Sequence, residues 1–594
     1  MSLIRKILSL FDSENKNRIF ILFWMMLLSA VLEVLGIGIV PIVIKYILQP
    51  EELKNFPWLY DFLDELNLLT TKHLFLVGSV MIILVFLMKN AYRFYVDFKQ
   101  LKLIKHIQTK LASDLFSKYL FSPYQLYLNR NTSTLIRNIN NEVSYIAAKV
   151  LIPSFLILLN IIILIAIFIS MLVVEFYMTT IVVSFLVIAM GGFNLLLRRK
   201  LRRYGKTMQQ ERRLQLQYLY QGLQGLKAIK VANREHFFYQ LFKNSTLRLA
   251  NTQLRVNMLS KLPSGYLEIV AVVMILFLTG GLLFLAYQGT ELTYLLSFFG
   301  LALVRMRQNF SAIMVNLNLV RSNEVSIDPV VKDMKIQKDR EQDDTSLDQS
   351  LNFEHKISFQ NVSFNYQSSE SKVINKINFE IEKGEIIGIA GATGGGKTTI
   401  LDLILGLHQP TEGYIKVDNV DLQSMLSLWQ KSVGYVPQNI YLLDDTIIAN
   451  IAFGIKPNNV DLDRVKEVVK AAQLFDFVNS LDKGLKSKVG ENGVKISGGQ
   501  RQRIGIARAL YNNPQILIFD EATSALDNKT ERKFVEILHG LDDDLTIIMV
   551  AHRLSTLEKC DRILFLENGM ISSQGSYQEL LKNNKLFQEM SGVT

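Results

Sequence analysis

The first half of the chain consists of long apolar runs separated by polar segments. Six of the runs are long enough to cross a bilayer, which takes about 20 residues in a helix. They cover residues 19–47, 73–96, 149–173, 177–197, 262–287 and 292–320. The pattern therefore predicts a polytopic α-helical membrane domain over residues 1–325, with six transmembrane helices.

Two long polar stretches, 98–138 and 198–259, follow the second and fourth apolar runs. They contain little Pro or Gly, so they predict helices that continue well beyond the membrane. Each is interrupted once, at 121–127 and at 222–233. We expect short transverse helices at these interruptions, ready to contact a cytoplasmic domain; a pair of ordinary helical hairpins is the alternative.

Charge indicates the orientation of the membrane domain. The net charge is +11, the segment 49–72 is acidic on balance, and the stretches after the second and fourth runs are basic. Because cytoplasmic loops carry an excess of Lys and Arg, both termini and the long loops are predicted to lie in the cytoplasm. The N-terminal residues 1–18 lack the pattern of a cleaved signal peptide and favour a helix on the membrane surface.

The single cysteine, Cys560, excludes an intrachain disulfide.

Segment 57–69 separates the first two runs and is amphipathic. Its apolar residues recur at helical spacing, with acids on the other face; they are Trp58, Leu59, Phe62, Leu63 and Leu66. This pattern predicts a helix that either lies in the outer membrane interface or packs on the end of the bundle.

Four basic residues lie inside the predicted spans: Lys89, Arg93, Arg305 and Arg307. Charges in a membrane are costly, so they indicate either a site for an anionic substrate or residues that snorkel or pair within the bundle. We assign Arg93 to snorkelling or pairing and treat the other three as candidate substrate residues. Arg305 and Arg307 are about 200° apart around a helix, so only one of them can face a central cavity.

Residues 326–354 are polar and charged and predict a linker, and residues 355–594 have the composition of a soluble α/β domain. In this domain, 391–398 fits G-x-x-x-x-G-K-[ST], a phosphate-binding loop, between a buried strand at 385–390 and a helix. Glycines let backbone amides converge on phosphate oxygens. The predicted ATP-binding residues of this loop are Gly391, Ala392, Thr393, Gly394, Gly395, Gly396, Lys397, Thr398 and Thr399.

Two residues of the loop and four outside it have expected roles in ATP binding and hydrolysis. Lys397 is expected to reach the β- and γ-phosphates, and Thr398 to ligate Mg²⁺. Two strands end in polar residues: 517–521 ends in Asp520, a Mg²⁺ ligand through water, and Glu521, which polarises the attacking water. The other strand ends in His552, placed to sense the γ-phosphate. Tyr366 is expected to stack on adenine.

With these motifs in order, the chain resembles the ATP-binding cassette (ABC) exporters, as a type IV half-transporter with six spans fused to one nucleotide-binding domain. The segment 496–500, Ile-Ser-Gly-Gly-Gln, matches the family signature except for Ile in place of Leu. The resemblance implies that Ser497, Gly498, Gly499 and Gln500 bind the γ-phosphate of ATP held by the other subunit. It also implies that Gln438 is a catalytic lid residue and a Mg²⁺ ligand, and that His552 is the switch histidine. Glu491 would lie in an exporter-specific loop and 524–527 at the dimer interface.

The resemblance implies ATP and Mg²⁺ as cofactors and an ATP hydrolase coupled to transport. Glu521 is intact, so one chain can supply both halves of a competent site, and we expect a homodimer with two ATP molecules. Alternating access follows from closing and opening this dimer. An importer is disfavoured because the two domains are fused, and an ATP-gated channel because Glu521 and His552 are present. The six spans exclude a soluble nucleic-acid-acting ATPase, so no nucleic-acid partner is expected.

For the substrate, the chain is similar to the bacterial lipid-linked oligosaccharide flippases, the PglK-like group. The features shared are segment 57–69, Lys89, the Arg305/Arg307 pair and the stretch 12–18. The resemblance implies a polyprenyl diphosphate glycan, flipped across the bacterial inner membrane, with basic residues holding the diphosphate and the outer helix contacting the lipid tail. The alternative is an exporter of a peptide, a drug-like amphiphile or lipid A. No peptidase domain precedes the first span, so cleavage of a leader peptide is not expected.

Overall fold

The computed structural model describes residues 5, 11, 13–65, 68–128, 130–284, 289–336, 351–366, 371–521, 544–551 and 554–591. The chain divides into two compact units, Met1–Glu341 and Gln342–Thr594. The first is helical, and the second contains both helices and two β-sheets.

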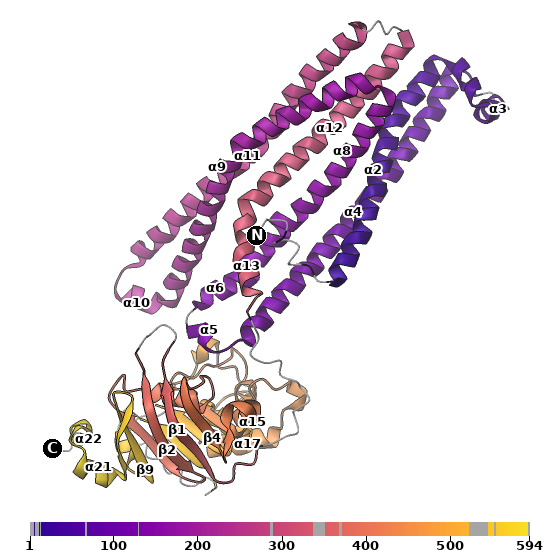
Figure 1. Ribbon diagram of the computed structural model, residues 1–594. Coiled ribbons are helices and arrows are strands. Elements are labelled where there is room, and N and C mark those ends of the chain that lie inside the picture. Colours follow the sequence, from indigo (N-terminus) through magenta and orange to yellow (C-terminus); the bar gives the residue numbers. More distant parts are fainter. Residues whose placement is uncertain are drawn as a thin grey trace. The chain divides into compact units, whose positions relative to one another are not determined.

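Six long helices form the described part of the helical unit: α2 (Ser13–Leu48), α4 (Thr71–Leu120), α8 (Ile152–Val174), α9 (Phe176–Gln224), α11 (Glu235–Phe284) and α12 (Gly289–Asn323). Helix α2 packs along α4, α9 packs along α11, and α8 lies against both α12 and α2 (Figure 1). Each predicted span falls within one of these helices, except that 285–287 lies outside the described residues and 149–151 precedes α8 as a π-helical turn.

Among the described residues, four helical stretches are long and apolar enough to cross a membrane: Glu14–Leu48, Thr71–Leu120, Thr132–Val174 and Glu235–Leu282. Helix α9 adds a shorter apolar stretch, Phe176–Ile188. Helix α12 is long enough but less apolar than these four, because polar side chains interrupt its apolar sequence: Arg305, Arg307, Gln308, Asn309, Asn316 and Asn318. A span with this composition needs polar partners or a cavity within the bundle.

The long extensions have the predicted form. Helices α4 and α9 continue without a break far past their apolar parts, and α4 alone spans about 75 Å at 1.5 Å per residue. Short helices follow them, α5 (Gln125–Leu128) and α10 (Leu226–Val231). Figure 1 shows both at the same end of the bundle, so the two predicted transverse helices are present.

The predicted amphipathic helix is α3 (Pro57–Glu65), at the opposite end of the bundle (Figure 1). It is shorter than the predicted 57–69. Leu63 is buried against Leu53 and Leu74, whereas Trp58 is 72% exposed. One part of the helix therefore packs on the bundle end, and its first turn offers an apolar ring to the surroundings.

The predicted linker 326–354 is too long at both ends. Helix α13 (Ile327–Asp333) buries Ile327 and Val330 in the core of the helical unit. Its carboxylate Asp333 accepts hydrogen bonds from the Tyr119 hydroxyl and Asn138 and pairs with Arg130. At the other end, Phe353 is buried in the core of the α/β unit. A helix of this length contributes too few apolar residues to stand out in a polar segment, so composition missed it.

The α/β unit contains a six-stranded sheet in the order β10-β9-β3-β8-β7-β6 and a four-stranded antiparallel sheet in the order β2-β1-β4-β5. The strands of the first sheet are β3 (Ile386–Gly391), β6 (Val433–Val436), β7 (Ile516–Asp520), β8 (Thr546–Val550), β9 (Arg562–Glu567) and β10 (Met570–Gly575). Those of the second are β1 (Lys356–Phe364), β2 (Ile374–Glu382), β4 (Glu412–Val417) and β5 (Val420–Asp421). In the first sheet, only β10 runs antiparallel to its neighbour.

The central residues of the parallel strands are apolar because both faces of the sheet are covered. One face shares a core with the four-stranded sheet and helix α14 (Lys397–Ile404), which includes Phe359, Ile389, Ile400 and Ile548. The other face packs against α16 (Ile447–Ile451), α17 (Leu462–Ala471) and α19 (Gly498–Tyr511). The helix that begins at the phosphate loop is therefore held between the two sheets.

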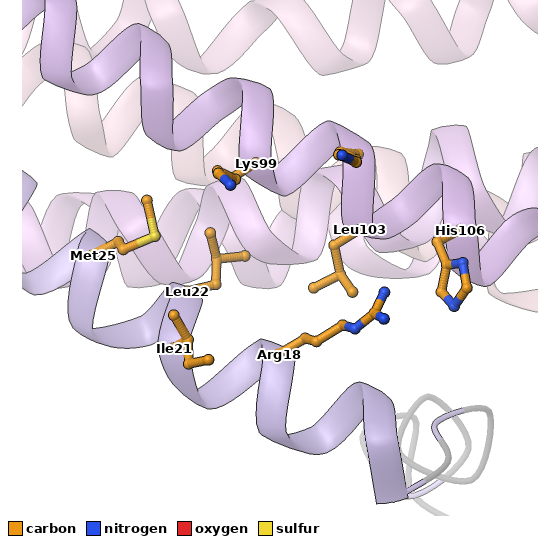
Figure 2. A pocket seen from close by; sticks show the side chains of 8 residues that line it. Arg18, Ile21, Leu22, Met25, Lys99, Leu103 and His106 are labelled. Carbon is orange, nitrogen blue, oxygen red and sulfur yellow. The ribbon is translucent and has the colours of Figure 1, made fainter.

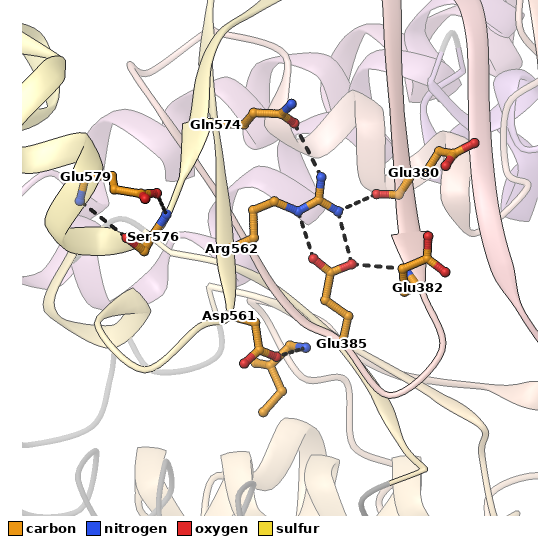
Figure 3. Close-up of polar contacts among 9 residues, drawn as sticks. Glu380, Glu382, Glu385, Asp561, Arg562, Gln574, Ser576 and Glu579 are labelled. Carbon is orange, nitrogen blue, oxygen red and sulfur yellow. Dashed lines mark hydrogen bonds and ion pairs between the residues drawn. The ribbon is translucent and has the colours of Figure 1, made fainter.

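Arg562 of β9 joins the two sheets (Figure 3). Its guanidinium donates to both carboxylate oxygens of Glu385, at 2.8 and 3.0 Å, and to the backbone carbonyl of Glu380 on β2 at 2.6 Å. Glu385 in turn accepts from the backbone amide of Glu382. A bidentate guanidinium fixes direction as well as distance, so this contact aligns the strand that leads into the phosphate loop.

Candidate functional site

The phosphate loop has the backbone that its glycines predict. Strand β3 ends at Gly391 with φ at +151°, and Gly396 adopts a φ of +100° directly before α14. A Cβ at Gly391 would lie 2.3 Å from the Leu566 carbonyl oxygen, so no larger residue fits there. These conformations turn the chain from strand to helix within a few residues and leave loop amides at a helix N-terminus, the arrangement that binds phosphate.

Lys397 is held inside this loop by the loop itself. Its Nζ donates to the carbonyl oxygens of Gly391 at 2.8 Å and Ala392 at 3.1 Å, and the residue is only 6% exposed. Burial lowers the pKa of Lys397, and the nearby Glu521 carboxylate opposes that effect. The hydrogen-bond acceptors of Nζ are neutral carbonyl oxygens. They position the ammonium without offsetting its positive charge.

Gln438, Asp520 and Glu521 meet at the carboxyl edge of the parallel sheet. Asp520 ends β7, and Gln438 follows β6, its neighbour in the sheet. The Gln438 side-chain amide donates to the Glu521 carboxylate. Glu521 has a φ of +50°, a left-handed conformation that is uncommon for non-glycine residues, and its amide donates to Val550 of β8. The structure thus brings together these three predicted residues beside the phosphate loop.

Burial and the neighbouring Glu521 raise the pKa of Asp520. Burial and the charge of Asp520 raise the pKa of Asp402, in α14, to about 6. Asp520 therefore interacts with a second carboxylate on either side, Asp402 and Glu521, although no three acidic residues of the described part of the chain are grouped as metal ligands. Sequence reasoning missed Asp402; the available signal was an acid in an otherwise apolar helix directly after the loop.

The Tyr366 side chain is fixed against the phosphate-loop helix. Its hydroxyl and the Thr399 hydroxyl are 3.1 Å apart and hydrogen-bonded, and its ring packs edge-on against Phe364 and His408. His408 was not singled out from the sequence. Its Nε2 lies 3.8 Å from the Asp402 carboxylate, and burial lowers the pKa of this imidazole.

The predicted signature segment begins α19. Ser497 and Gln500 form a capping box, in which the Ser497 hydroxyl accepts from the Gln500 amide and the Gln500 side chain accepts from the Ser497 amide. Gly498 has no atom within 4 Å of the position of a Cβ, so the first turn of the helix faces open space. Glu491 is exposed in a neighbouring turn. His552 and the segment 524–527 lie outside the described residues.

A charged centre lies among the membrane helices. Lys89 of α4 is 4% exposed, and its Nζ is 3.1 Å from the Glu33 carboxylate of α2. Arg305 of α12 approaches the same carboxylate oxygen at 3.4 Å. Gly36 makes room for the lysine, since a Cβ there would lie 3.0 Å from its Nζ. Two cations against one carboxylate leave the centre with a net charge of one positive unit.

The two arginines of α12 point to different helices, as their spacing predicts. Arg305 joins the charged centre, whereas Arg307 pairs at 3.5 Å with Glu268 of α11, which is 68% exposed. Glu33 is the residue that sequence reasoning missed. It is a lone carboxylate inside an apolar span. Like Lys89, it is costly in a membrane and therefore indicates a binding site or an ion pair.

Comparisons with known proteins agree with this architecture. The family model for the ABC transporter transmembrane region matches residues 19–306, and the ABC transporter model matches residues 374–524. Similar curated proteins include an ATP-dependent lipid A-core flippase of Cupriavidus metallidurans, 41% identical over 39% of this chain and 39% of its own length. A leukotoxin export ATP-binding protein, LtxB, of Aggregatibacter actinomycetemcomitans is 43% identical over 39% of this chain and 32% of its own length.

The chain therefore spans about two fifths of the length of the curated relatives that it matches first. One solved structure, described as a bacterial Atm1-family ABC exporter with ATP bound, has a TM-score of 0.78 and covers 98% of this chain and 99% of its own. Its sequence identity is 22%, so the likeness concerns the fold. A transmembrane region and an ATP-binding domain of this family lie in one polypeptide, and the chain is thus a multi-pass membrane protein of the ABC transporter family, a half-transporter.

Proposed function

We propose that this protein is an ATP-driven exporter that moves an anionic, lipid-like amphiphile across the bacterial inner membrane. The most specific form of the proposal is the flipping of a polyprenyl diphosphate glycan by a homodimer, with the nucleotide-binding domains in the cytoplasm. The observation that carries it is the charged centre, in which Lys89 and Arg305 converge on Glu33 inside apolar helices.

The charged centre suits a diphosphate. Ionisable residues within a membrane region are costly and mark binding sites or ion pathways. A guanidinium can bind phosphate oxygens bidentately, and an ammonium adds a point charge. Glu33 is the counterion of both cations when no anion is present, and the excess positive charge favours an anion over a neutral amphiphile. Arg307, paired elsewhere, is not required for this recognition.

The ATP site supplies the driving force. When bound, Mg²⁺ neutralises charge on the phosphates and polarises them for attack by water. Thr398 and Asp520 fit as its ligands, with Gln438 beside them, and the raised pKa of Asp520 fits a site that a cation would complete. Lys397 holds the phosphates, Glu521 orients the water, His552 senses the γ-phosphate and Tyr366 packs on adenine.

We further propose that the second half of each ATP site comes from the partner subunit. Ser497, Gly498, Gly499 and Gln500 of one chain would bind the ATP held by the phosphate loop of the other. Two ATP molecules would then close the dimer, and their hydrolysis would release it, which alternates access to the membrane cavity.

Lipid A-core is a second candidate substrate, because several curated relatives are named as its flippases. Similar identity to a leukotoxin exporter shows that these partial matches do not separate substrates. A phosphorylated glycolipid would satisfy the charged centre by the same chemistry. A peptide is less well matched to a buried cationic site with an apolar surround.

The experiment is ATP hydrolysis by the purified protein in liposomes, with and without a polyprenyl diphosphate oligosaccharide or lipid A-core. Wild type is compared with Arg305→Ala and with Arg307→Ala as the matched control on the same helix. The proposal expects the polyprenyl lipid to stimulate wild type and Arg307→Ala, and Arg305→Ala to lose only that stimulation. If the protein hydrolyses ATP without lipid and neither lipid changes the rate, the proposal that it is a flippase is wrong. If only lipid A-core stimulates hydrolysis, lipid A-core is favoured as the substrate.

A further inference from the structure

A second cationic site lies between helices α2 and α4, apart from the charged centre. It is a pocket of about 290 Å³ that has Arg18 on one wall and Lys99, Lys102 and His106 on the other (Figure 2). Its floor is apolar and includes the buried side chains Leu22 and Leu103. We call this the interfacial pocket.

The basic side chains of the pocket are arranged to act together. Lys99, Lys102 and His106 follow one another at i, i+3 and i+7, so they share one face of α4. Figure 2 shows Arg18 extending across from α2 toward Leu103 and His106. None of the eight residues that line the pocket is acidic.

The existing partners of these cations leave them able to bind an anion. Arg18 pairs with Glu14 at 2.7 Å, but both side chains are about half exposed, at 48% and 62%, and such surface pairs are weak. Lys99 lies over the Tyr95 ring at 5.3 Å, a contact that does not neutralise its charge.

The pocket lies at the edge of the apolar segments of both helices. Arg18 directly precedes the apolar run that begins at Ile19, and Lys99 follows the run that ends at Val96. The positive-inside pattern places this edge at the cytoplasmic leaflet. Lys89 is ten residues away on α4, which corresponds to about 15 Å along a helix, so the interfacial pocket is separate from the charged centre.

An apolar stripe continues from the pocket along α2. Ile21 lines the pocket, and the exposed side chains Leu28 and Leu35 follow it at intervals of seven residues on the same face of the helix; the three are between 49% and 61% exposed. A cationic pocket at the end of an apolar stripe complements a molecule with an anionic headgroup and hydrocarbon chains.

We propose that the interfacial pocket binds the phosphate headgroup of an anionic phospholipid of the cytoplasmic leaflet, with its acyl chains along the apolar stripe. The lipid is a bound ligand and not cargo. The inference does not rest on the proposed transport substrate, because neither Lys89 nor Arg305 takes part in it.

Tryptophan fluorescence tests this directly on the full-length protein in vesicles. The chain has three tryptophans; Trp58→Phe removes the one on α3, and Trp429 is buried in the α/β unit. Trp24, beside the pocket, then reports quenching by lipids with brominated acyl chains. In vesicles of phosphatidylcholine with a small fraction of brominated phosphatidylglycerol, we expect stronger quenching than with the same fraction of brominated phosphatidylcholine.

Charge variants then locate the effect. Lys99→Gln/Lys102→Gln should weaken the preference for phosphatidylglycerol by about 30-fold, the change expected for two surface cations. Lys105→Gln/Lys110→Gln removes the same charge from α4 outside the pocket and should keep the preference. Equal quenching by the two lipids in wild type would overturn the proposal. An equal loss in both double variants would assign the preference to general surface charge, and would overturn it as well.

Discussion

The two functional regions each bury a lysine, and they hold it in different ways. Lys397 donates to two carbonyl oxygens of its own loop, at 2.8 and 3.1 Å. Lys89 pairs with Glu33, a full negative charge from another helix, at 3.1 Å. The phosphate loop therefore presents its cation to an incoming phosphate with neutral hydrogen-bond acceptors, and Glu521 acts on it through its charge. In the membrane centre, an incoming anion meets a lysine that already has a counterion.

The difference has a functional consequence. In the phosphate loop, backbone carbonyl oxygens position the cation that is proposed to bind the phosphates of ATP. A cation in the membrane would be costly without a counterion, and Glu33 removes that cost. Arg305 then supplies the surplus charge. Selectivity for an anionic substrate depends, on this account, on three side chains from three helices.

The largest effect is expected from Glu33→Ala, which leaves Lys89 buried without its counterion. Removing one partner of a buried pair costs about 3–5 kcal/mol, so the variant should unfold at a clearly lower temperature in detergent. The double variant Glu33→Ala/Lys89→Met should recover most of the loss, since it removes the fully buried one of the two orphaned charges, whereas Arg305 is 35% exposed. If the double variant is as unstable as the single one, the ion pair is not the cause.

Lys397→Ala tests the other half of the comparison. Both hydrogen bonds of the lysine lie within its own loop, so the fold should persist while ATP hydrolysis falls by about 100-fold or more, the cost of losing one charge-stabilising group. Phosphate release and thermal unfolding are measured together, with the exposed Lys466→Ala as the control. Hydrolysis at the wild-type rate in Lys397→Ala would refute the role given to this loop.

Glu521→Gln tests whether the carboxylate of this residue polarises the attacking water. The amide keeps the shape and can still contact Gln438, but it polarises water poorly, so hydrolysis should fall by roughly 100-fold with ATP binding retained. Glu589→Gln, an exposed acid in the same unit, serves as the control. Loss of ATP binding in Glu521→Gln would show that this residue acts on the nucleotide and not on the water.

A smaller effect concerns pH and Asp402. Its folded-state pKa is about 6, above the usual value near 4. Between about pH 4 and 6, Asp402 therefore keeps its proton in the folded protein and releases it in the unfolded chain. The stability that this proton contributes is fully present below about pH 4 and is lost as the pH rises through about 6. Asp402→Asn should be more stable than wild type at pH 7 without nucleotide, with the difference shrinking toward pH 4. A pH-independent difference between the two melting temperatures would contradict this origin.

The smallest effect is expected from Arg307→Ala. Its partner Glu268 is 68% exposed, and a pair of this kind is worth less than about 1 kcal/mol. Thermal unfolding should change little, in contrast to Arg305→Ala, whose partner Glu33 is buried. Equal destabilisation by the two variants would indicate that α12 is held by both arginines alike.

The sequence was sufficient for the phosphate loop because the partners of Lys397 are five and six residues away from it. The same holds for the capping box of Ser497 and Gln500 and for the long polar extensions of α4 and α9. Short-range spacing carries these features, and the conformations of Gly391 and Gly396 follow from residue type alone.

The sequence was insufficient where a contact joins distant segments. Glu33 and Lys89 are far apart in the chain, and Arg305 is farther still, so only the packing of α2, α4 and α12 brings them together. The same reason applies to Asp333 of α13, which contacts Tyr119 and Arg130 within the helical unit. The predicted linker was too long because these contacts, and the burial of Ile327, leave no mark in local composition.

The most direct test of the central claim is transport itself. Fluorescent polyprenyl diphosphate glycan is reconstituted with the protein in liposomes, and its movement between leaflets is followed after addition of ATP. We predict ATP-dependent movement by wild type and Arg307→Ala, and none by Glu521→Gln or Arg305→Ala. Movement that persists in Arg305→Ala, or ATP hydrolysis by wild type without any movement of this lipid, would contradict the account.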